Sequence, residues 1–200
     1  ARHPIFGESI RRLFLPDEGG AWGKFDYSSQ EPRITLHFAH RAGIRGAAQF
    51  VQRYHDDPRF CQHSYAADVL HTERGHCKGI NLGLTYGMGI DKMAAQLGIS
   101  KDEAQQLKAD YKRELPFVSG VADYYTKLAE RTGVSRTELG RIGWFPNTDY
   151  CYKALNRAVQ GTGADLMKMA IVLVHEELGM TPLLTVHDET DYTIYEEEHA

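Results

Sequence analysis

The chain of 200 residues has few cysteines, few prolines and no long apolar run. Its three cysteines are widely spaced, odd in number and form no CxxC pair, which argues against a disulfide framework or a zinc site and is typical of reduced thiols in the cytoplasm. The longest apolar run, near residues 170–174, is far shorter than the roughly 20 residues that a membrane-spanning helix needs. No signal-peptide pattern opens the chain, so we expect a cytoplasmic protein with no membrane partner.

What is present is an ordinary globular composition, 42% apolar and 25% charged, in a chain long enough for one domain or two small ones. The net charge of −4 argues weakly against nucleic-acid binding when it is taken as an average. The last 32 residues, however, hold eight acids and no Lys or Arg. An acidic centre beside a basic flank suits an enzyme that holds metal ions against a polyanion. The chain starts at Ala1 and stops in an acidic run, so we expect a fragment of a longer protein.

The acidic C-terminal region contains two adjacent acids, Asp188 and Glu189, between segments rich in β-branched and aromatic residues. These segments, residues 183–186 and 192–195, are predicted to be two strands joined by a tight turn. Two carboxylates at such a turn repel each other, and no Lys or Arg follows Lys168 to neutralise them. We therefore expect their partner to be a hard divalent cation bound through oxygen atoms.

A third acid, Asp26, lies near the other end of the chain. Residues 10–15 are predicted to form a short strand that ends in a Pro-Asp-Glu-Gly-Gly turn. A helix is then predicted to begin after Ser28 or Ser29, with Glu31 in its first turn. Asp26 is therefore expected where a strand ends and a helix begins, which is a common place for an active-site side chain.

The middle of the chain shows helical patterns separated by glycine and proline. A β-hairpin arm is predicted at residues 133–146, with Gly140 near its turn, and a long helix at about 149–178. That helix is apolar nearly all round between residues 166 and 174, so we expect it to be buried. The predicted helices of the middle region lie near residues 47–54, 63–71, 74–86, 92–97 and 101–130.

This order of elements predicts an α+β protein in which a sheet is built from both ends of the chain and carries an all-helical insertion. Asp26 and Asp188, with Glu189 beside the second, would then come from separate strand ends. Such carboxylates can bridge two Mg²⁺ ions that stabilise the attacking and leaving oxygens of an in-line phosphoryl displacement. Alternatively, any one of these acids could be an ordinary turn residue that binds no metal ion.

Four residues in the middle region, Arg74, Lys78, Leu82 and Tyr86, recur every fourth position. On a helix each step of four turns by about 40°, so the four side chains form one winding stripe. The stripe is cationic at its start and aromatic at its end, which suits a triphosphate followed by a base. An amphipathic surface helix with cations at one end is the alternative interpretation.

Together these motifs resemble those of family-A DNA polymerases, the DNA polymerase I-like enzymes. Residues 26–33 (DYSSQEPR) resemble the first motif of that family, and residues 187–189 (HDE) resemble its last catalytic motif. Residues 74–87 are similar to its nucleotide-binding finger helix, and residues 156–165 to its palm helix. The four motifs occur in the family's order across nearly the whole chain, in a style typical of bacteriophage members.

The resemblance implies a polymerase palm, an antiparallel sheet with packed helices, at residues 1–42 and 147–200. An all-helical fingers subdomain would occupy residues 43–145, with the hairpin arm near 133–146. The implied activity is template-directed addition of dNTPs to a primer 3′-hydroxyl on primer–template DNA, with two Mg²⁺ ions, or Mn²⁺, as cofactors. A bacteriophage member would act in the cytoplasm of a bacterial host.

The resemblance also implies a role for individual residues. The implied catalytic residues are Asp26, Asp188, Glu189 and Lys78, of which the three acids would bind the metal ions. The implied nucleotide-binding residues are His63, Arg74, Lys78, Leu82, Tyr86 and Glu31. The implied DNA-binding residues are Asn156, Gln160 and His187.

Three of these implied roles are specific. Glu31 would be a steric gate that occupies the space needed by a ribose 2′-hydroxyl, and Lys78 would be an acid toward the leaving pyrophosphate. Position 82 is Leu, where the family usually has Phe or Tyr. The smaller side chain is expected to affect discrimination between sugars and the speed of the reaction, but not the reaction itself. Two alternatives stay open, a single-subunit RNA polymerase of the same architecture and a non-catalytic DNA-binding relative. The sequence does not identify a processivity factor.

Overall fold

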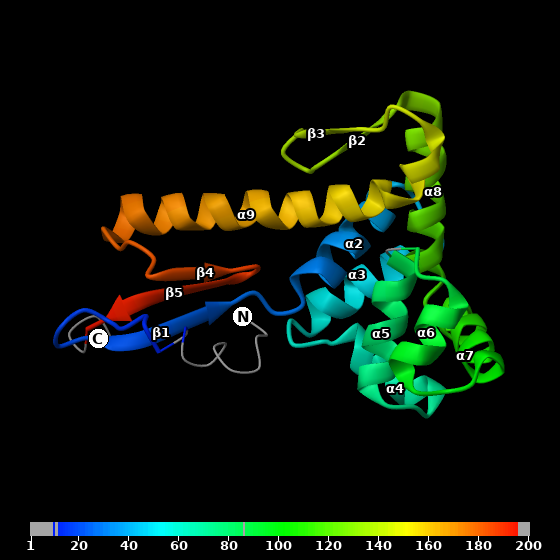
Figure 1. Cartoon of the computed structure of the whole chain (residues 1–200), viewed down its shortest axis with the longest axis horizontal. Helices are drawn as coiled ribbons and strands as arrows, with labels where there is room; N and C mark the ends of the chain where they lie inside the picture. The colour runs from blue at the N-terminus through cyan, green and yellow to red at the C-terminus, as the bar shows by residue number, and fades with distance from the viewer. Residues whose placement is uncertain (1–9, 11, 86, 196–200) are drawn as a thin grey trace. The chain divides into compact units, whose positions relative to one another are not determined.

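The structure, a computed structural model, describes residues 10, 12–85 and 87–195. The chain divides into two compact units, one made of residues 1–30 and 163–200 and the other of residues 31–162. Figure 1 shows the elements of each unit. No helix among the described residues combines the length and the apolar character that crossing a membrane requires.

The first unit is built on a three-stranded antiparallel sheet in the order β1-β5-β4. Its strands are β1 (Ala21–Asp26), β4 (Leu184–Val186) and β5 (Glu189–Ile194). The N-terminal strand therefore pairs with the middle strand, which comes from the other end of the chain. This pairing confirms the prediction that both chain ends build one sheet.

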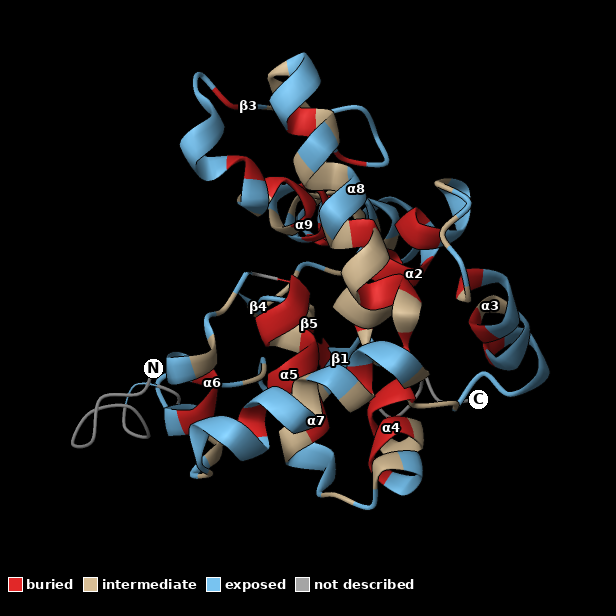
Figure 2. Cartoon of the chain, turned by 90° about the vertical axis from the view of Figure 1, so that its right-hand side faces the viewer, coloured by how far each residue is buried: buried red, intermediate tan, exposed pale blue. Residues whose placement is uncertain are grey.

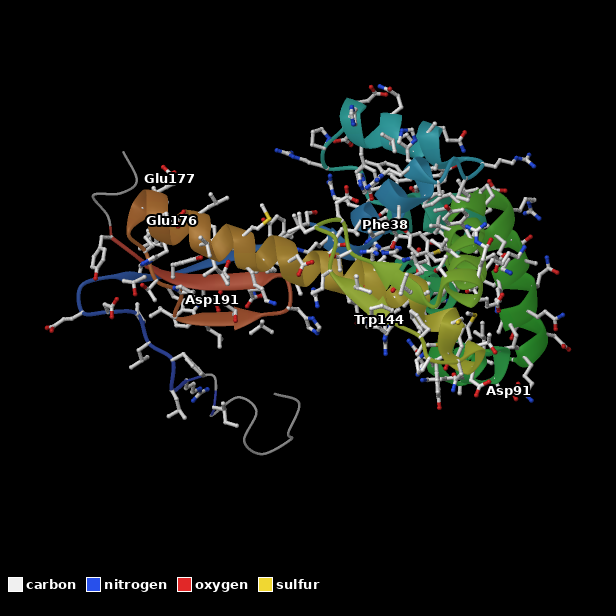
Figure 3. The ribbon with its side chains drawn as sticks, turned by 90° about the horizontal axis from the view of Figure 1, so that it is seen from above. Phe38, Asp91, Trp144, Glu176, Glu177 and Asp191 are labelled. Carbon is white, nitrogen blue, oxygen red and sulfur yellow. The ribbon has the colours of Figure 1, made fainter. Side chains whose placement is uncertain are left out.

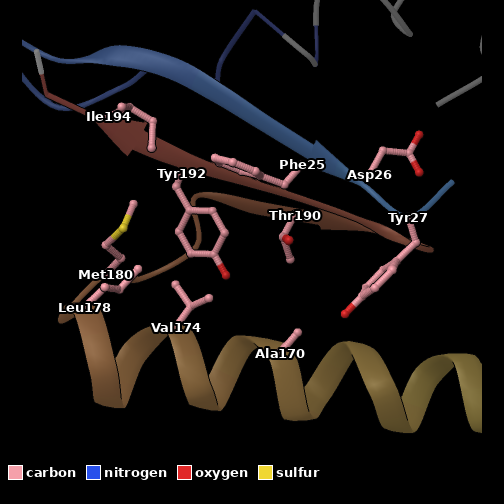
Figure 4. A pocket seen from close by; sticks show the side chains of 10 residues that line it. All are labelled: Phe25, Asp26, Tyr27, Ala170, Val174, Leu178, Met180, Thr190, Tyr192 and Ile194. Carbon is pink, nitrogen blue, oxygen red and sulfur yellow. The ribbon is translucent and has the colours of Figure 1, made fainter. Parts of the chain in front are cut away.

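One face of this sheet turns toward the C-terminal part of α9 (Ala154–Leu178). Figure 4 shows the rings of Phe25 and Tyr192 on that face, and the two rings pack edge to face with their centroids 5.9 Å apart. Between the sheet and the helix lies a cleft of about 600 Å³. Its remaining lining is mostly apolar and includes Val174, Leu178 and Met180.

The helical unit, residues 31–162, has a core of its own that includes Phe50, Ile80 and Phe117. Its α-helices are α2 (Gln30–Arg41), α3 (Ala47–Asp56), α4 (Gln62–Leu70), α5 (Arg74–Thr85), α6 (Ile90–Leu97), α7 (Lys101–Glu114) and α8 (Pro116–Thr132). It also contains the arm strands β2 (Val134–Arg136) and β3 (Ile142–Trp144) and the 3₁₀-helix η1 (Thr148–Lys153).

Helix α5 is the centre of this unit, because it packs against α4, α6, α7 and α8. Figure 2 shows buried residues along α4 and α5. A buried polar cluster joins three of the helices: the Asn81 side-chain oxygen accepts a hydrogen bond from the Gln62 amide at 2.9 Å and one from the Tyr111 hydroxyl at 3.1 Å. Buried polar groups that are bonded in this way fix the relative position of the elements that carry them.

The hairpin arm is present, with Gly140 in the left-handed region at φ 88°, as expected near its turn. The arm is fixed to the first turns of α9 by arginines. Arg157 donates to the Trp144 carbonyl oxygen at 2.7 Å and stacks on the Phe145 ring at 4.8 Å, and Arg141 donates to the Gly161 carbonyl oxygen at 2.7 Å.

Three predictions about individual elements were wrong. Residues 10–15 contain no strand in their described part, where residues 12 and 13 form a turn. The helical stretch 101–130 is two helices. Pro116 has no amide hydrogen to donate to the preceding turn, and it begins α8 as its first residue. The apolar stretch of α9 is not buried all round: Met169, Val172 and Leu173 are exposed, since the sheet can cover only one face of a helix.

Candidate active site

The acids at the two ends of the chain come together at one corner of the sheet. Asp26, the last residue of β1, pairs with Glu189, the first residue of β5. His187 and Asp188 form the two-residue turn between β4 and β5, and the Asp188 carbonyl oxygen accepts a hydrogen bond of 3.0 Å from the Tyr27 amide. His187 has a φ of 57°, in the left-handed region that two-residue hairpin turns use. Asp26 and Asp188, 162 positions apart in sequence (188 − 26), therefore lie at one corner of the sheet.

The charges of these acids act on one another. Partial desolvation raises the pKa of Asp26 above its ordinary value, and the negative charges of Asp188 and Glu189 raise it further. Asp26 is exposed, whereas Asp188 and Glu189 are half-buried. Hard carboxylate oxygens at an accessible corner are chemically suited to a divalent cation. No set of three or more His, Cys, Asp and Glu side chains in the described ranges is close enough to hold a metal by itself.

The prediction that no basic residue lies near these acids was wrong. Lys24 on β1 bonds its ammonium to the Glu189 carboxylate. This hydrogen bond and the charges of Glu189, Asp191 and Asp26 raise the pKa of Lys24. Asp191 lies on β5, as Figure 3 shows, directly opposite Lys24. The prediction considered only residues that follow the acids in sequence, and strand pairing brings Lys24 from the opposite end of the chain.

Three residues of the predicted nucleotide-binding stripe, Arg74, Lys78 and Leu82, lie on one face of α5. Arg74 and Lys78 are exposed, and Leu82 is half-buried one turn further along. The opposite face of α5 is buried and carries Cys77, Ile80 and Asn81 among others. The helix thus presents two cations to solvent while its other face is held by four neighbouring helices.

His63 on α4 lies close enough to Arg74 and Lys78 for their charges to act on its ring. The residue is 4% exposed, and burial lowers its pKa to about 4, with a further contribution from the charges of Arg74 and Lys78. The ring is therefore neutral near pH 7. Its Nδ1 is buried and has no hydrogen-bond partner among the described residues, which is unusual for a buried polar atom.

The remaining predicted site residues are dispersed over other elements. Glu31 lies half-buried in the first turn of α2, and the prediction for Tyr86 falls outside the described residues. Asn156 and Gln160 lie one turn apart on α9, as predicted, with Gln160 exposed. The buried Oδ1 of Asn156 has no partner in the described part of the chain.

Sequence reasoning missed Cys61, which lies beside the predicted triphosphate site. Arg74 donates a hydrogen bond to the Cys61 sulfur at 3.6 Å. Burial raises the pKa of Cys61, but hydrogen bonds from Ser64, Arg74 and the His63 amide outweigh it and lower the pKa to about 7. Since the contact joins α5 to the residue before α4, only the fold reveals it.

We therefore expect Cys61 to be the most reactive of the three thiols. Iodoacetamide should label it half-maximally near pH 7, because the thiolate is the nucleophile. Cys77 and Cys151 are matched internal controls, since burial raises the pKa of both, that of Cys77 to about 11. Mass spectrometry of the folded protein checks this order. Arg74→Ala should slow labelling of Cys61 at pH 7, and equal labelling of Cys77 would contradict the prediction.

The chain is similar to known DNA polymerases. The sequence profile described as DNA polymerase family A matches residues 3–200. A DNA-directed DNA polymerase of Pseudomonas phage M6 is 31% identical over 98% of this chain and 36% of its own length. The thermostable DNA polymerase I of Thermus aquaticus is 32% identical over 94% of this chain and 24% of its own length.

A solved structure gives the same result. It is described as the POL domain of Pol1 from M. smegmatis in complex with DNA primer-template and dNTP, and its TM-score is 0.77 at 26% identity. The match covers 98% of this chain and 38% of that one. The chain spans only about a quarter to two fifths of the length of these proteins. With a profile that matches almost every residue, the chain belongs to DNA polymerase family A.

Proposed function

We propose that this chain forms the palm and fingers of a template-directed DNA polymerase that adds dNTPs to a primer 3′-hydroxyl. The observation that carries the proposal is the convergence of Asp26, Asp188 and Glu189 at the corner where β1 meets the β4–β5 hairpin. The M. smegmatis relative was solved with primer–template DNA and dNTP, the partners that we assign to this chain. The palm would comprise residues 1–42 and 147–200, which include the whole sheet unit, and the fingers would comprise residues 43–145, which lie within the helical unit.

Membership in the family implies divalent cations, and the residues present fit them. Asp26 and Asp188 offer hard oxygen ligands, and desolvation together with the negative charges of Asp188 and Glu189 raises the pKa of Asp26, so a bound divalent cation would offset both effects. We assign the two Mg²⁺ ions, which Mn²⁺ could replace, to Asp26 and Asp188, with Glu189 in support. When bound, such ions polarise the phosphate and the attacking hydroxyl.

The helical unit would bind the nucleotide. Arg74 and Lys78 present two exposed cations one turn apart on α5, a spacing that suits neighbouring phosphates. Lys78 would also protonate the leaving pyrophosphate. His63, neutral because its pKa is about 4, would offer a hydrogen bond to a phosphate rather than a charge. Leu82 and Tyr86 would lie along the sugar and the templating base.

The DNA contacts would come from α9 and the hairpin tip. Asn156 and Gln160, one turn apart, would bond the acceptors that all correct base pairs present in the minor groove. His187 would lie by the primer end. A bacteriophage source, which the Pseudomonas phage relative supports, would place the reaction in a bacterial host's cytoplasm.

Primer extension with dNTPs and rNTPs, with and without Mg²⁺, tests this function in the protein that contains the chain. Mg²⁺-dependent extension with dNTPs is expected. Extension with rNTPs alone would favour the RNA polymerase of the same architecture. Metal-independent DNA binding without any extension would favour the non-catalytic relative.

Glu31→Ala is expected to relax discrimination against ribonucleotides. If its side chain fills the space of the 2′-hydroxyl, its removal should raise the relative use of rNTPs by about 10- to 200-fold, the usual range of a steric pocket. Single-nucleotide insertion gives kcat/KM for matched rNTP and dNTP. Glu130→Ala, an exposed acid on α8, is the control and should leave the ratio unchanged. An unaltered ratio in Glu31→Ala would contradict the gate.

A further inference from the structure

Lys24 shares one face of the sheet with three acids. The strand register places Lys24 opposite Asp191 and Asp26 opposite Glu189. Residues directly opposite on paired strands project from the same face, as do residues two positions apart on one strand. Figure 4 shows Phe25 on the face toward α9 and the Asp26 carboxylate pointing away from it. The ammonium and the three carboxylates therefore form one group on the face away from α9.

Lys24 is the only basic residue in the three strands, all of whose residues the structure describes. Its ammonium bonds to Glu189, and Asp26 and Asp191 are close enough for their charges to act on it. The Glu189 side chain is 18% exposed and Asp191 is 2% exposed, so water screens these charges only in part. The Lys24 side chain is 55% exposed, so it can swing away into solvent.

We propose that Lys24 is a resident counter-ion of the acidic centre that competes with divalent cations. Its ammonium neutralises the carboxylates while no metal is bound and holds Glu189 against the sheet. Lys24 would leave Glu189 when a metal ion binds at Asp26 and Asp188. This inference rests on the proposed metal-binding role of those two acids. Lys24 is thus a positioning residue whose charge sets the metal concentration that the site requires.

Mn²⁺ affinity is the direct test, measured by electron paramagnetic resonance of the free ion in the full protein. Lys24→Met keeps an unbranched side chain that is one atom shorter and removes the charge. It should bind Mn²⁺ at least about tenfold more tightly, because one unit charge about 6 Å from a divalent ion has this effect even in water, and water screens these charges only in part. Lys24→Arg keeps the charge and should bind as the unsubstituted protein does. Without metal, Lys24→Met should unfold at a lower temperature than Lys24→Arg.

The variant Asp26→Asn distinguishes the counter-ion proposal from the assignment of the metal ions to Asp26 and Asp188. If Asp26→Asn weakens Mn²⁺ binding while Lys24→Met binds no more tightly than the unsubstituted protein, the counter-ion proposal is overturned and the metal assignment stands. If Asp26→Asn leaves Mn²⁺ affinity unchanged, the metal assignment fails and the competition fails with it.

A second measurement uses the unsubstituted protein and covers the case in which Lys24→Met does not fold. Mn²⁺ should free the ammonium from Glu189, so acetic anhydride should acetylate Lys24 faster in saturating Mn²⁺ than without metal. Mass spectrometry of the peptide measures this rate, and exposed Lys92 on α6 serves as the reference. An unchanged rate at Lys24 relative to Lys92 would overturn the proposal.

Discussion

Asp188→Asn and Asp26→Asn are each expected to reduce primer extension by about a thousandfold, on the order of the loss when a group that stabilises charge in a transition state is removed. Asparagine keeps the shape of the side chain and removes the negative charge that would hold a cation. The fold should persist, because Asp188 bonds to Tyr27 through its main-chain carbonyl and Asp26 is exposed at a strand end. In Asp188→Asn, one of the two charges that add to desolvation in raising the pKa of Asp26 would also be removed.

Single-turnover extension of a labelled primer measures this effect, and circular dichroism verifies the fold. Glu176→Gln is the matched control, since this acid is exposed at the C-terminal end of α9, as Figure 3 shows. It should retain the extension rate of the unsubstituted protein. If either aspartate variant kept more than a few percent of the rate, that aspartate would not be a metal ligand in the reaction.

The acidic corner could be predicted because its residues carry strong local signals. The β-branched and aromatic flanks of Asp188 indicated a hairpin, and the change from strand to helix pattern after Asp26 indicated a strand end. The two strands pair directly in the structure, with Asp26 opposite Glu189. One detail differs: β5 begins at Glu189, so only His187 and Asp188 form the turn.

What could not be predicted depends on contacts between distant segments. The approach of Lys24 to Glu189 requires the register of β1 on β5, and sequence proximity to the acids gives no hint of it. The exposed apolar face of α9 was misjudged for a related reason. Apolar periodicity reports which residues could be buried, whereas the number of elements that cover a helix decides which ones are buried. Leu173, for example, is 52% exposed.

The helical unit shows the same division. The stripe of Arg74 and Lys78 followed from a spacing of four, and the structure places both on the exposed face of α5. The hydrogen bonds from Gln62 and Tyr111 to Asn81, which fix that helix from its buried side, join residues 19 and 30 positions apart. Nothing in the sequence around Gln62, Asn81 and Tyr111 indicated that these three side chains would bond to one another. Local spacing therefore predicted the stripe, but it did not predict the buried contacts that hold α5 in place.

Lys78→Ala is expected to lower kcat by about 100- to 10,000-fold, the range for a lost general acid, and to raise the KM for dNTP. The physical reason is that Lys78 projects from a helix whose other face is held by α4, α6, α7 and α8, so its ammonium is presented at a defined position. Removal of the side chain should leave that packing intact, because Lys78 is exposed.

Two further variants distinguish the proton from the charge. Lys78→Arg keeps the positive charge, but a guanidinium gives up its proton far less readily than an ammonium, so nucleotide binding should persist while kcat stays low. Arg74→Ala should raise KM more than it lowers kcat, because a pure phosphate contact acts in the ground state as well as in the transition state. Steady-state insertion of one nucleotide gives both constants, with exposed Lys92→Ala as the control. A Lys78→Arg variant with the full kcat would show that Lys78 binds the triphosphate through its charge alone.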